Sequence, residues 1–301
     1  MKHIVCYSGG HSSGLVAIEV VRRYGKENVI LLNHDISLKV EEQDIKRFKK
    51  QVADYLGMPI TYKNYNDLPV EELPDQFEIV EIEKSFISPQ TRQALCTSRL
   101  KTVPLTLYLE HEFPDKNATL YYGFDDTELI RVERRKVILN DMGFASDYPL
   151  ALWGNFGNLR KFYEKQGVNF ESVIITENWI NTDSFERTIF STKELGIEPP
   201  NTYSVFKHAN CTGCLKAGQQ HWYCVYIYAN HIFERAKLSE ERIGYSIIKG
   251  AFLKELEPKF EKMKCAGVVA TEHTPFQTFW SQAKKYLKKL EEDIKPCECT
   301  F

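Results

Sequence analysis

The sequence predicts an α/β protein in which a doubly wound parallel sheet is followed by a helical C-terminal part. Over the first 65 residues, short apolar runs alternate with amphipathic stretches, and only short turns separate them. This alternation indicates right-handed βαβ units and therefore a parallel sheet. From about residue 201 the patterns are helical instead. We therefore expect an α/β domain over residues 1–200 and a helical region with several cysteines over residues 201–301.

Glycines and apolar runs place the first half of the expected sheet. In order, we expect a strand at 4–7, a helix at 15–24, a strand at 29–33, a helix at 41–56 and a strand at 60–65. Gly25 and Gly57 end the two helices, because glycine suits the position after a helix. Residues 68–86 are acidic and interrupted by prolines, so we expect a surface segment that covers the edge of the sheet.

The later elements are expected at less regular intervals. A helical pattern over 91–113 is interrupted at Pro104, because proline lacks the N–H group that a helix interior needs. The other expected elements are strands at 120–124, 147–153 and 173–175, a helix at 157–166, an inserted segment at 177–190, a helix that ends near 236, and helices over 240–256 and 276–290.

Charge and composition bear on the kind of partner. The formal net charge is −2, and no apolar run approaches the ~20 residues that a membrane-spanning helix needs. We therefore expect no membrane partner, and the charge gives no support to nucleic acid, although Lys284, Lys285, Lys288 and Lys289 form a small basic stretch. The N-terminal residues lack the features of a signal peptide. We expect a cytoplasmic protein whose eight cysteines serve metal, cluster or redox chemistry.

The stretch Ser8-Gly9-Gly10-His11-Ser12-Ser13 joins the first strand to the first helix. Its adjacent glycines allow a sharp turn and let an anion approach backbone N–H groups, and Ser12 or Ser13 is expected to cap the helix. Since the helix dipole points at the same place, the stretch predicts a phosphate-binding loop. It is neither a Walker loop nor a G-x-G-x-x-G motif. An ordinary strand–turn–helix connection is the alternative.

Three further groups of residues follow strand ends or occur at helical spacing. They are Asp35; Cys96, Arg99 and Lys101; and Gly123, Glu128, Arg131 and Arg135. The aspartate follows the second strand, at the edge where parallel sheets bind ligands, and the cations could hold phosphate or sulfate oxygens. The alternatives, in the same order, are a turn residue for the first group, a structural cysteine beside solvated cations for the second, and an exposed ion-paired helix for the third.

In their order and spacing, these motifs resemble the phosphoadenosine-phosphosulfate-reductase-like branch of the PP-loop ATP pyrophosphatases, the adenine-nucleotide α-hydrolase superfamily. The resemblance spans residues 3 to 250 and includes Tyr148-Pro149-Leu150, Trp153 and Cys211-x-x-Cys214 before Trp222. Ser12 stands where the family usually has Asp, which leaves the backbone cradle but removes a carboxylate for magnesium. The resemblance implies an adenine nucleotide, ATP with or without Mg²⁺, bound by Ser8, Gly9, Gly10, His11, Ser12, Ser13, Asp35, Gly123 and Arg135, with Lys101 and Arg131 as catalytic cations.

The cysteines divide this branch of the superfamily. The resemblance to its cluster-bearing members implies a [4Fe–4S] cluster on Cys96, Cys211 and Cys214, with one open iron. If Asn210 caps a helix, the last two cysteines share its first turn, where the dipole favours thiolates. The alternatives are a redox dithiol and a structural zinc bound by Cys211 and Cys214 together with Cys96, His208, His221 or Cys224. Cys6, Cys224 and Cys265 are expected in the core.

The resemblance leads to an enzyme that splits ATP between its α and β phosphates, adenylates an acceptor and transfers sulfur to it with the help of the cluster. The alternative is a reductase of phosphoadenylyl or adenylyl sulfate, in which Cys299, preceded by Cys297, is the catalytic nucleophile and a thioredoxin-like protein the reductant. A nucleotide-binding module without catalysis is the third option. The other expected partners are a sulfur donor and, as one option, a second copy of the chain.

Overall fold

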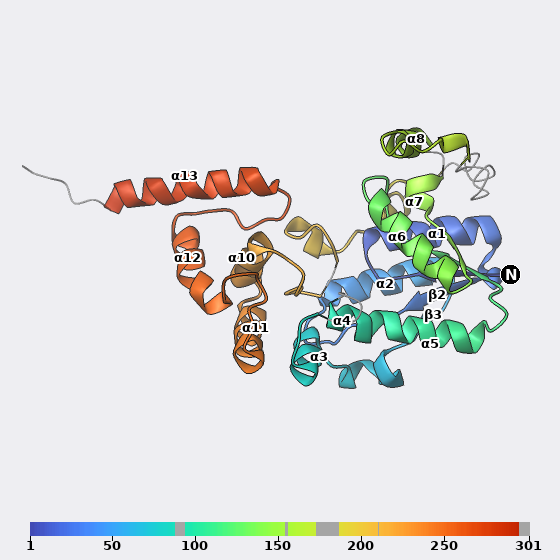
Figure 1. The fold of residues 1–301 in the computed structure, drawn as a ribbon, viewed down its shortest axis with the longest axis horizontal. Helices are drawn as coiled ribbons and strands as arrows, with labels where there is room; N and C mark the ends of the chain where they lie inside the picture. The colour runs from blue at the N-terminus through green and yellow to red at the C-terminus, as the bar shows by residue number, and fades with distance from the viewer. Residues whose placement is uncertain (88–93, 154–155, 173–186, 210, 295–301) are drawn as a thin grey trace, which may run out of the picture. The chain divides into compact units, whose positions relative to one another are not determined.

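The computed structural model describes residues 1–87, 94–153, 156–172, 187–209 and 211–294, which form two compact units (Figure 1). The first unit comprises Met1–Asp35, Gln43–Leu68 and Val103–Pro200, and the second comprises Ile36–Glu42, Pro69–Thr102 and Asn201–Phe301. Residues 36–42 and 69–102, which lie within the expected first domain, thus belong to the second unit.

The first unit is built on a five-stranded parallel sheet, as the sequence predicts. Its strands are β1 (Lys2–Cys6), β2 (Val29–Asn33), β3 (Ile60–Tyr62), β4 (Ala118–Tyr121) and β5 (Ala145–Asp147). Their order is β3-β2-β1-β4-β5, and in β1 Val5 pairs with Leu31 on one side and Tyr121 on the other. The strand order reverses between β1 and β4, and the carboxyl ends of such neighbours form the crevice in which α/β sheets bind ligands.

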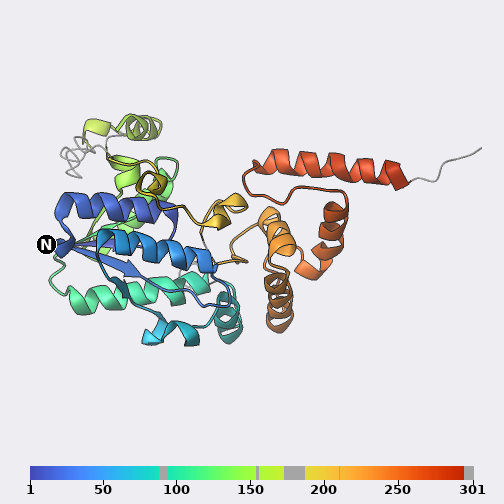
Figure 2. The same cartoon turned by 180° about the vertical axis from the view of Figure 1, so that it is seen from behind.

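Helices cover both faces of this sheet. They are α1 (His11–Tyr24), α2 (Gln43–Leu56), α5 (Val103–Glu112), α6 (Leu129–Asp141), α7 (Pro149–Leu152) and α8 (Phe156–Glu164). Right-handed crossovers place α1 and α2 on one face, seen in Figure 2, and α5 and α6 on the other, seen in Figure 1. Fully buried Ile4, Val16 and Phe48 belong to the core, and each such side chain contributes about 1.5–3 kcal/mol of transfer free energy.

The second unit is helical in the described residues. Its helices are α3 (Gln76–Glu83), α4 (Leu95–Thr97), a π-helical turn (Ser98–Thr102), α10 (Gln219–Tyr228), α11 (Asn230–Ile243), α12 (Leu253–Cys265) and α13 (Phe276–Ile294). Trp222, Phe233 and Phe260 are fully buried in its core. Short 3₁₀ turns complete the two units, at Lys26–Asn28, Tyr65–Asp67, Val70–Glu72, Thr192–Leu195 and Asn201–Ser204.

Helix α3 lies within residues 68–86, where a surface segment that covers the edge of the sheet was expected. Asp75 caps the helix, since its Oδ1 accepts from the N–H groups of Phe77 at 2.8 Å and Glu78 at 2.7 Å, and the carboxylate of Glu78 accepts from the Asp75 N–H at 2.8 Å. This capping box satisfies helix N–H groups that have no partner inside the helix. Acidic residues that suggested a solvated surface therefore begin a helix.

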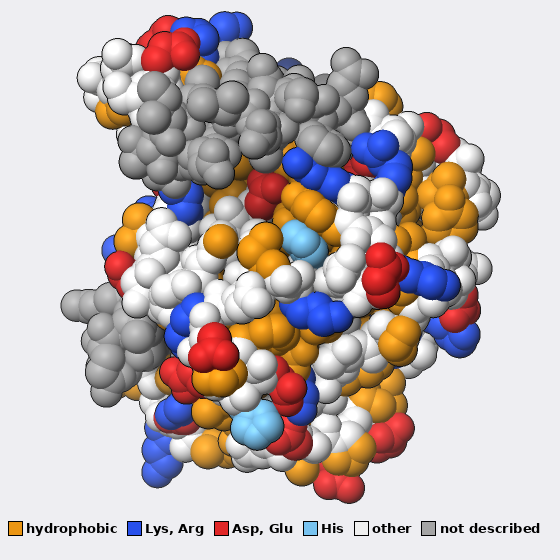
Figure 3. All heavy atoms as spheres, turned by 90° about the vertical axis from the view of Figure 1, so that its right-hand side faces the viewer, with side chains coloured by type: hydrophobic (Ala, Val, Ile, Leu, Met, Phe, Trp, Pro, Cys, Tyr) orange, Lys and Arg blue, Asp and Glu red, His pale blue; other side chains and the backbone are white. Residues whose placement is uncertain are grey.

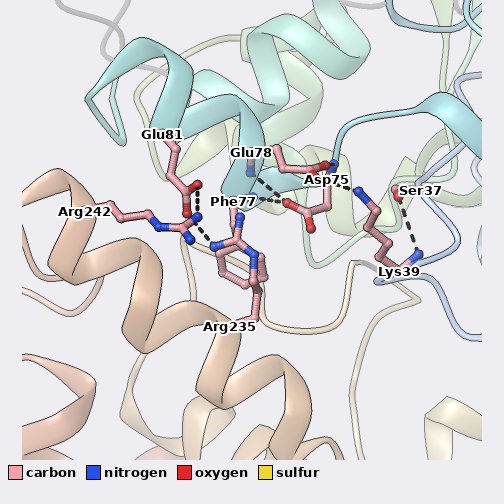
Figure 4. A network of polar contacts seen from close by, with 8 residues as sticks. All are labelled: Ser37, Lys39, Asp75, Phe77, Glu78, Glu81, Arg235 and Arg242. Atoms are coloured by element: carbon pink, nitrogen blue, oxygen red, sulfur yellow. Dashed lines mark hydrogen bonds and ion pairs between the residues drawn. The ribbon is translucent and has the colours of Figure 1, made fainter.

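Helix α3 is also tied to α11 by charge. Glu81 accepts hydrogen bonds from Arg235 and Arg242 (Figure 4). At the other end of the same network, Lys39 Nζ lies 2.6 Å from Glu78 Oε1. The acidic side chains of α3 thus form ion pairs with lysine and arginine side chains of the second unit.

Three other expected elements are corrected. Strand β5 ends at Asp147, because Pro149 begins the short helix α7, where a missing N–H costs nothing. The helix expected to end near 236 is two helices that meet at Ala229, and the expected helix at 240–256 is instead the end of α11 and the start of α12. A π-helical turn directly precedes α5, whose second residue is Pro104. The expected strand at 173–175 and most of segment 177–190 lie outside the described residues.

Helix hydropathy and surface charge bear on the partners expected from the sequence. No described helix is both long enough and apolar enough to cross a membrane. On the face drawn in Figure 3, basic and acidic side chains are interspersed among the coloured residues, without an extended region of one sign. This distribution agrees with the small net charge of −2.

Candidate functional site

The glycine turn continues β1 beyond the sheet. The Tyr7 N–H donates to the Leu32 carbonyl at 2.8 Å, which keeps the chain beside β2 until the turn begins. Gly9 has a φ of +86°, and a Cβ built on it would lie 2.4 Å from Cγ of Lys49. Both the backbone conformation and the close approach of the lysine therefore require glycine here.

Helix α1 begins at His11 without a side-chain cap. The expectation that Ser12 or Ser13 caps the helix is wrong, because both lie inside it and Gly10 is the N-cap. Ser13 Oγ instead donates to the Gly10 carbonyl at 2.8 Å, and Ser8 Oγ donates to Ser13 Oγ at 3.2 Å. The first turn also carries no acidic residue. Neither a side-chain cap nor a carboxylate of the first turn therefore neutralises the positive end of the helix dipole. This favours an anion at this end of the helix.

Gly123 brings the segment after β4 against the start of α1. A Cβ built on Gly123 would lie 2.9 Å from the Ser13 nitrogen and 3.0 Å from the Ser12 carbonyl carbon, and both are backbone atoms. Serines and glycine of two distant segments thus meet where the strand order reverses, as expected from strand ends at one edge of a parallel sheet.

Asp35 lies beside the same turn but is engaged by two lysines of α2. Its Oδ1 is 2.8 Å from Lys46 Nζ and 2.9 Å from Lys49 Nζ. The side chain of Asp35 is 10% exposed and that of Lys49 only 2%. Burial by itself would raise the pKa of Asp35, but the two ammonium groups outweigh it and hold this pKa below its ordinary value.

The two lysines were missed by the sequence reasoning. Lys49 shares the buried stripe of α2 with Ile45, Phe48 and Val52, a spacing at which an apolar residue is normal. A lysine on the apolar face of a predicted helix was therefore the available signal, since such a residue must find a carboxylate or another polar partner.

Replacing Asp35 by Asn should lower the free energy of unfolding by about 3 kcal/mol at pH 7, because it removes the carboxylate charge that faces the buried Lys49 ammonium. The pKa of Asp35 is lower in the folded protein, so its contribution is present above the unfolded pKa and disappears as the pH falls through the folded value. Urea unfolding of D35N and wild type between pH 3 and pH 7 should therefore converge below about pH 4.

The exposed Lys50–Asp54 pair on α2 provides the matched control. D54N removes a carboxylate from the same helix, but both side chains are more than half exposed, so we expect a loss of only about 0.5 kcal/mol or less. Equal losses in D35N and D54N would contradict the assignment of a buried ion pair.

The predicted cations of α6 contact aromatic rings. Arg131 pairs with Glu128, as the spacing predicts, and its Cζ lies 4.3 Å from the centroid of the Phe124 ring. Arg135 Cζ lies 5.4 Å from the centroid of Tyr122. Both arginines thus lie on the helix that follows the Gly123 segment, at the carboxyl end of β4.

His11 of the predicted site has an internal role in the first unit. Its Nε2 accepts from the Thr192 N–H at 3.2 Å, and burial lowers the pKa of this imidazole. The neutral imidazole of His11 thus already accepts a hydrogen bond, and this bond holds the segment around Thr192 against α1. Lys101 belongs to the second unit, in the π-helical turn after Cys96.

Cys96, Cys211 and Cys214 are neighbours in the second unit. Burial raises the pKa of Cys96, and the charge of Cys214 raises it further. Burial likewise raises the pKa of Cys211 to about 11, while the Lys101 ammonium acts in the opposite direction. Three cysteine sulfurs with a nearby cation are, once deprotonated, a donor set that suits an iron–sulfur cluster or zinc chemically. In the described residues, no three His, Cys, Asp or Glu side chains are arranged so that they could hold a metal ion.

The turn of Cys211 and Cys214 is not helical, contrary to expectation. Helix α10 begins only at Gln219, so its dipole does not act on Cys211 as predicted, and the pKa of this thiol is raised rather than lowered. Asn210, the expected cap, lies outside the described residues. Metal binding at Cys211 must therefore overcome a protonated, buried thiol.

His221 orients this turn and is engaged at both ring nitrogens. Its Nε2 accepts from the Cys214 N–H at 3.2 Å, and its Nδ1 lies 2.6 Å from Glu272 Oε1. The hydrogen bonds assign the proton to Nδ1. This arrangement disfavours His221 as a zinc ligand, because the nitrogen that would bind the metal already accepts a hydrogen bond.

The remaining cysteines are distributed as follows. Cys224 is fully buried with a pKa raised to about 12 by burial, as expected of a core residue. Cys265 is exposed on α12, so its expected place in the core is wrong. Cys6 is half-buried at the end of β1. Cys299, the predicted nucleophile of the reductase alternative, and the preceding Cys297 lie outside the described residues.

Fold and site together define an α/β protein with a parallel five-stranded sheet and a glycine turn where its strand order reverses. The chain is 26% identical over 176 residues to a protein of Escherichia phage lambda described as "Uncharacterized nin region protein ORF290". The match covers 51% of this chain and 59% of the phage protein, so the chain spans less than two thirds of that relative. No family model and no solved structure matches the chain.

Proposed function

We propose that this chain is a PP-loop enzyme of the phosphoadenosine-phosphosulfate-reductase-like kind, which binds an adenine nucleotide and acts in sulfur transfer. One observation carries the proposal: the uncapped start of α1 meets Gly123 at the reversal of strand order, with no room for a side chain. A helix N-terminus approached by glycine backbone at this edge is suited to phosphate groups.

The first unit would hold and activate the nucleotide. Backbone N–H groups at the start of α1 and the hydroxyls of Ser8 and Ser13 would bind phosphate oxygens, and Arg135 would add positive charge. The α phosphorus of ATP would be attacked by an acceptor oxygen that loses its proton, and pyrophosphate would leave. Preorganised donors stabilise the charge that develops in such a step, which is the largest catalytic contribution expected in phosphoryl-type chemistry. A sulfur nucleophile would then displace AMP from the acceptor.

The second unit would carry the sulfur chemistry. Cys96, Cys211 and Cys214 would hold a [4Fe–4S] cluster, or zinc as the alternative, and the cluster would supply an open iron for sulfur. Lys101 would lower the thiol pKa values as the ligands lose their protons. His221 would keep the Cys214 backbone in place through its hydrogen bond.

Release of pyrophosphate from γ-labelled ATP, with AMP followed from α-labelled ATP, tests the enzymatic proposal. We expect AMP and pyrophosphate in equal amounts over repeated turnovers only when acceptor and sulfur donor are both supplied, and no turnover without ATP. Sulfite formation from adenylyl sulfate without ATP would instead identify a reductase. Tight binding of ATP without turnover under any of these conditions would leave a binding module and overturn the proposed activity.

A further inference from the structure

Beyond the glycine turn, aromatic rings and arginines gather at the carboxyl end of β4. The rings of Tyr122, Phe124 and Tyr148 are nearly parallel, with interplanar angles of 12–23° and centroids 5.6–6.0 Å apart. Arg131 covers Phe124 and Arg135 covers Tyr122, at 4.3 Å and 5.4 Å from the ring centroids. We call these five residues the aromatic–arginine cluster.

The cluster has a closed inner part and an open outer part. Tyr148 and Tyr122 are buried, whereas Phe124 is half-buried and the side chain of Arg131 is 58% exposed. Arg131 is also paired with Glu128 of the same helix turn. One face of the guanidinium therefore rests on a ring, its edge is held by a carboxylate, and its exposed part reaches solvent. Packing in the core explains the inner rings, whereas the Arg131–Phe124 pair lies at the open part of the cluster.

We propose that Phe124 and Arg131 form a stacking surface for a nucleobase. Bases stack on aromatic rings and on arginine planes, and a nearby cation suits the phosphate that a nucleotide carries. The planar, fixed guanidinium provides this surface at little cost in conformational entropy. The inference rests on the proposed function, because it assumes a nucleotide whose phosphates lie at the glycine turn.

The position of the cluster supports a role next to the phosphates. Gly123, whose backbone meets the start of α1, is the residue directly before Phe124. On the β2 side of the turn, Asp35 is instead occupied by two lysines. The aromatic surface thus lies on the β4 side of the phosphate site. The base is either the adenine of the bound nucleotide or a base of the acceptor, and the two have the same chemistry.

Calorimetric titration of the full chain with tripolyphosphate, ATP and a single-stranded trinucleotide tests the proposal. F124L keeps apolar bulk but removes the ring, and it should weaken binding of ATP or of the trinucleotide by at least about fivefold. R131K should give a similar loss, since lysine keeps the charge but has no plane. F113L is the matched control. Phe113 is half-buried and precedes β4 in the chain, so it lies on the side of the amino end of this strand, whereas the cluster lies at its carboxyl end. It should bind all three ligands like wild type.

The ligands separate the outcomes. A loss confined to ATP assigns the adenine to the cluster, and a loss confined to the trinucleotide assigns a base of the acceptor. Unchanged binding of both in F124L, with thermal unfolding as in wild type, would overturn the proposal. If wild type binds neither tripolyphosphate nor ATP, the proposed phosphate site is wrong. Weaker trinucleotide binding in F124L would, even then, support the role of the aromatic–arginine cluster in stacking a base.

Discussion

Replacing Gly123 by alanine should lower ATP-dependent pyrophosphate release roughly 100-fold, as expected when groups at a reacting centre shift by about 1 Å. The new Cβ would lie 2.9 Å from the Ser13 nitrogen and 3.0 Å from the Ser12 carbonyl carbon. Real Cβ atoms do not tolerate such distances, and backbone at the start of a helix cannot turn away as a long side chain would. The start of α1 must therefore move relative to β4. Initial rates with saturating ATP, and tripolyphosphate affinity, measure the loss.

Gly218 provides the control for this variant. It precedes α10 with a φ of −89°, and no atom lies within 4 Å of the Cβ that alanine would add. G218A should therefore keep wild-type pyrophosphate release. If G123A also kept it, with tripolyphosphate binding unchanged, the junction of the Gly123 segment with α1 would not be part of the phosphate site.

The sheet could be predicted because its signals are local. Apolar runs, glycine stops and short turns lie within a few residues of one another, and the parallel arrangement follows from their alternation. The Ser8-Gly9-Gly10 turn was found for the same reason. What it packs against was not predictable, since Lys49 and Gly123 reach it from segments 40 and more than 100 residues away in the sequence. Such contacts depend on register and helix rotation, which periodicity does not determine.

Two local sequence patterns led to wrong expectations, because contacts with distant segments decided the structure there. The acidic residues before residue 86 indicated a solvated segment, but Asp75 caps α3 and Glu81 pairs with arginines of α11. Cys211 and Cys214 have a spacing that would suit a helix, yet the Thr212 N–H donates to the Val40 carbonyl at 2.9 Å. Gly213, which lies between them, has a φ of +74°, and a residue in this left-handed region interrupts a right-handed helix. Backbone conformation and long-range contacts thus override local propensity here.

Changing Cys211 or Cys214 to serine should remove the metal from anaerobically purified protein. If the proposed cluster is present, wild type should contain about four irons and about four sulfides per chain, with broad visible absorption, and either variant should contain almost none. The reason is that three thiolates are the minimum for a cluster with one open iron, and a serine hydroxyl is a far poorer ligand for iron. Metal analysis and absorption spectra report this directly, whether or not the enzyme turns over.

The chain offers a matched control in Cys265, which is exposed on α12. C265S should keep the full iron content, because this thiol is no part of the proposed donor set. Zinc that is lost in C211S and C214S but kept in C265S would replace the cluster with a structural metal site and remove its open iron from the mechanism. If wild type held neither metal, Cys211 would remain a buried thiol with a raised pKa. Sulfur would then have to reach the acceptor by another route, since a protonated thiol is a poor nucleophile.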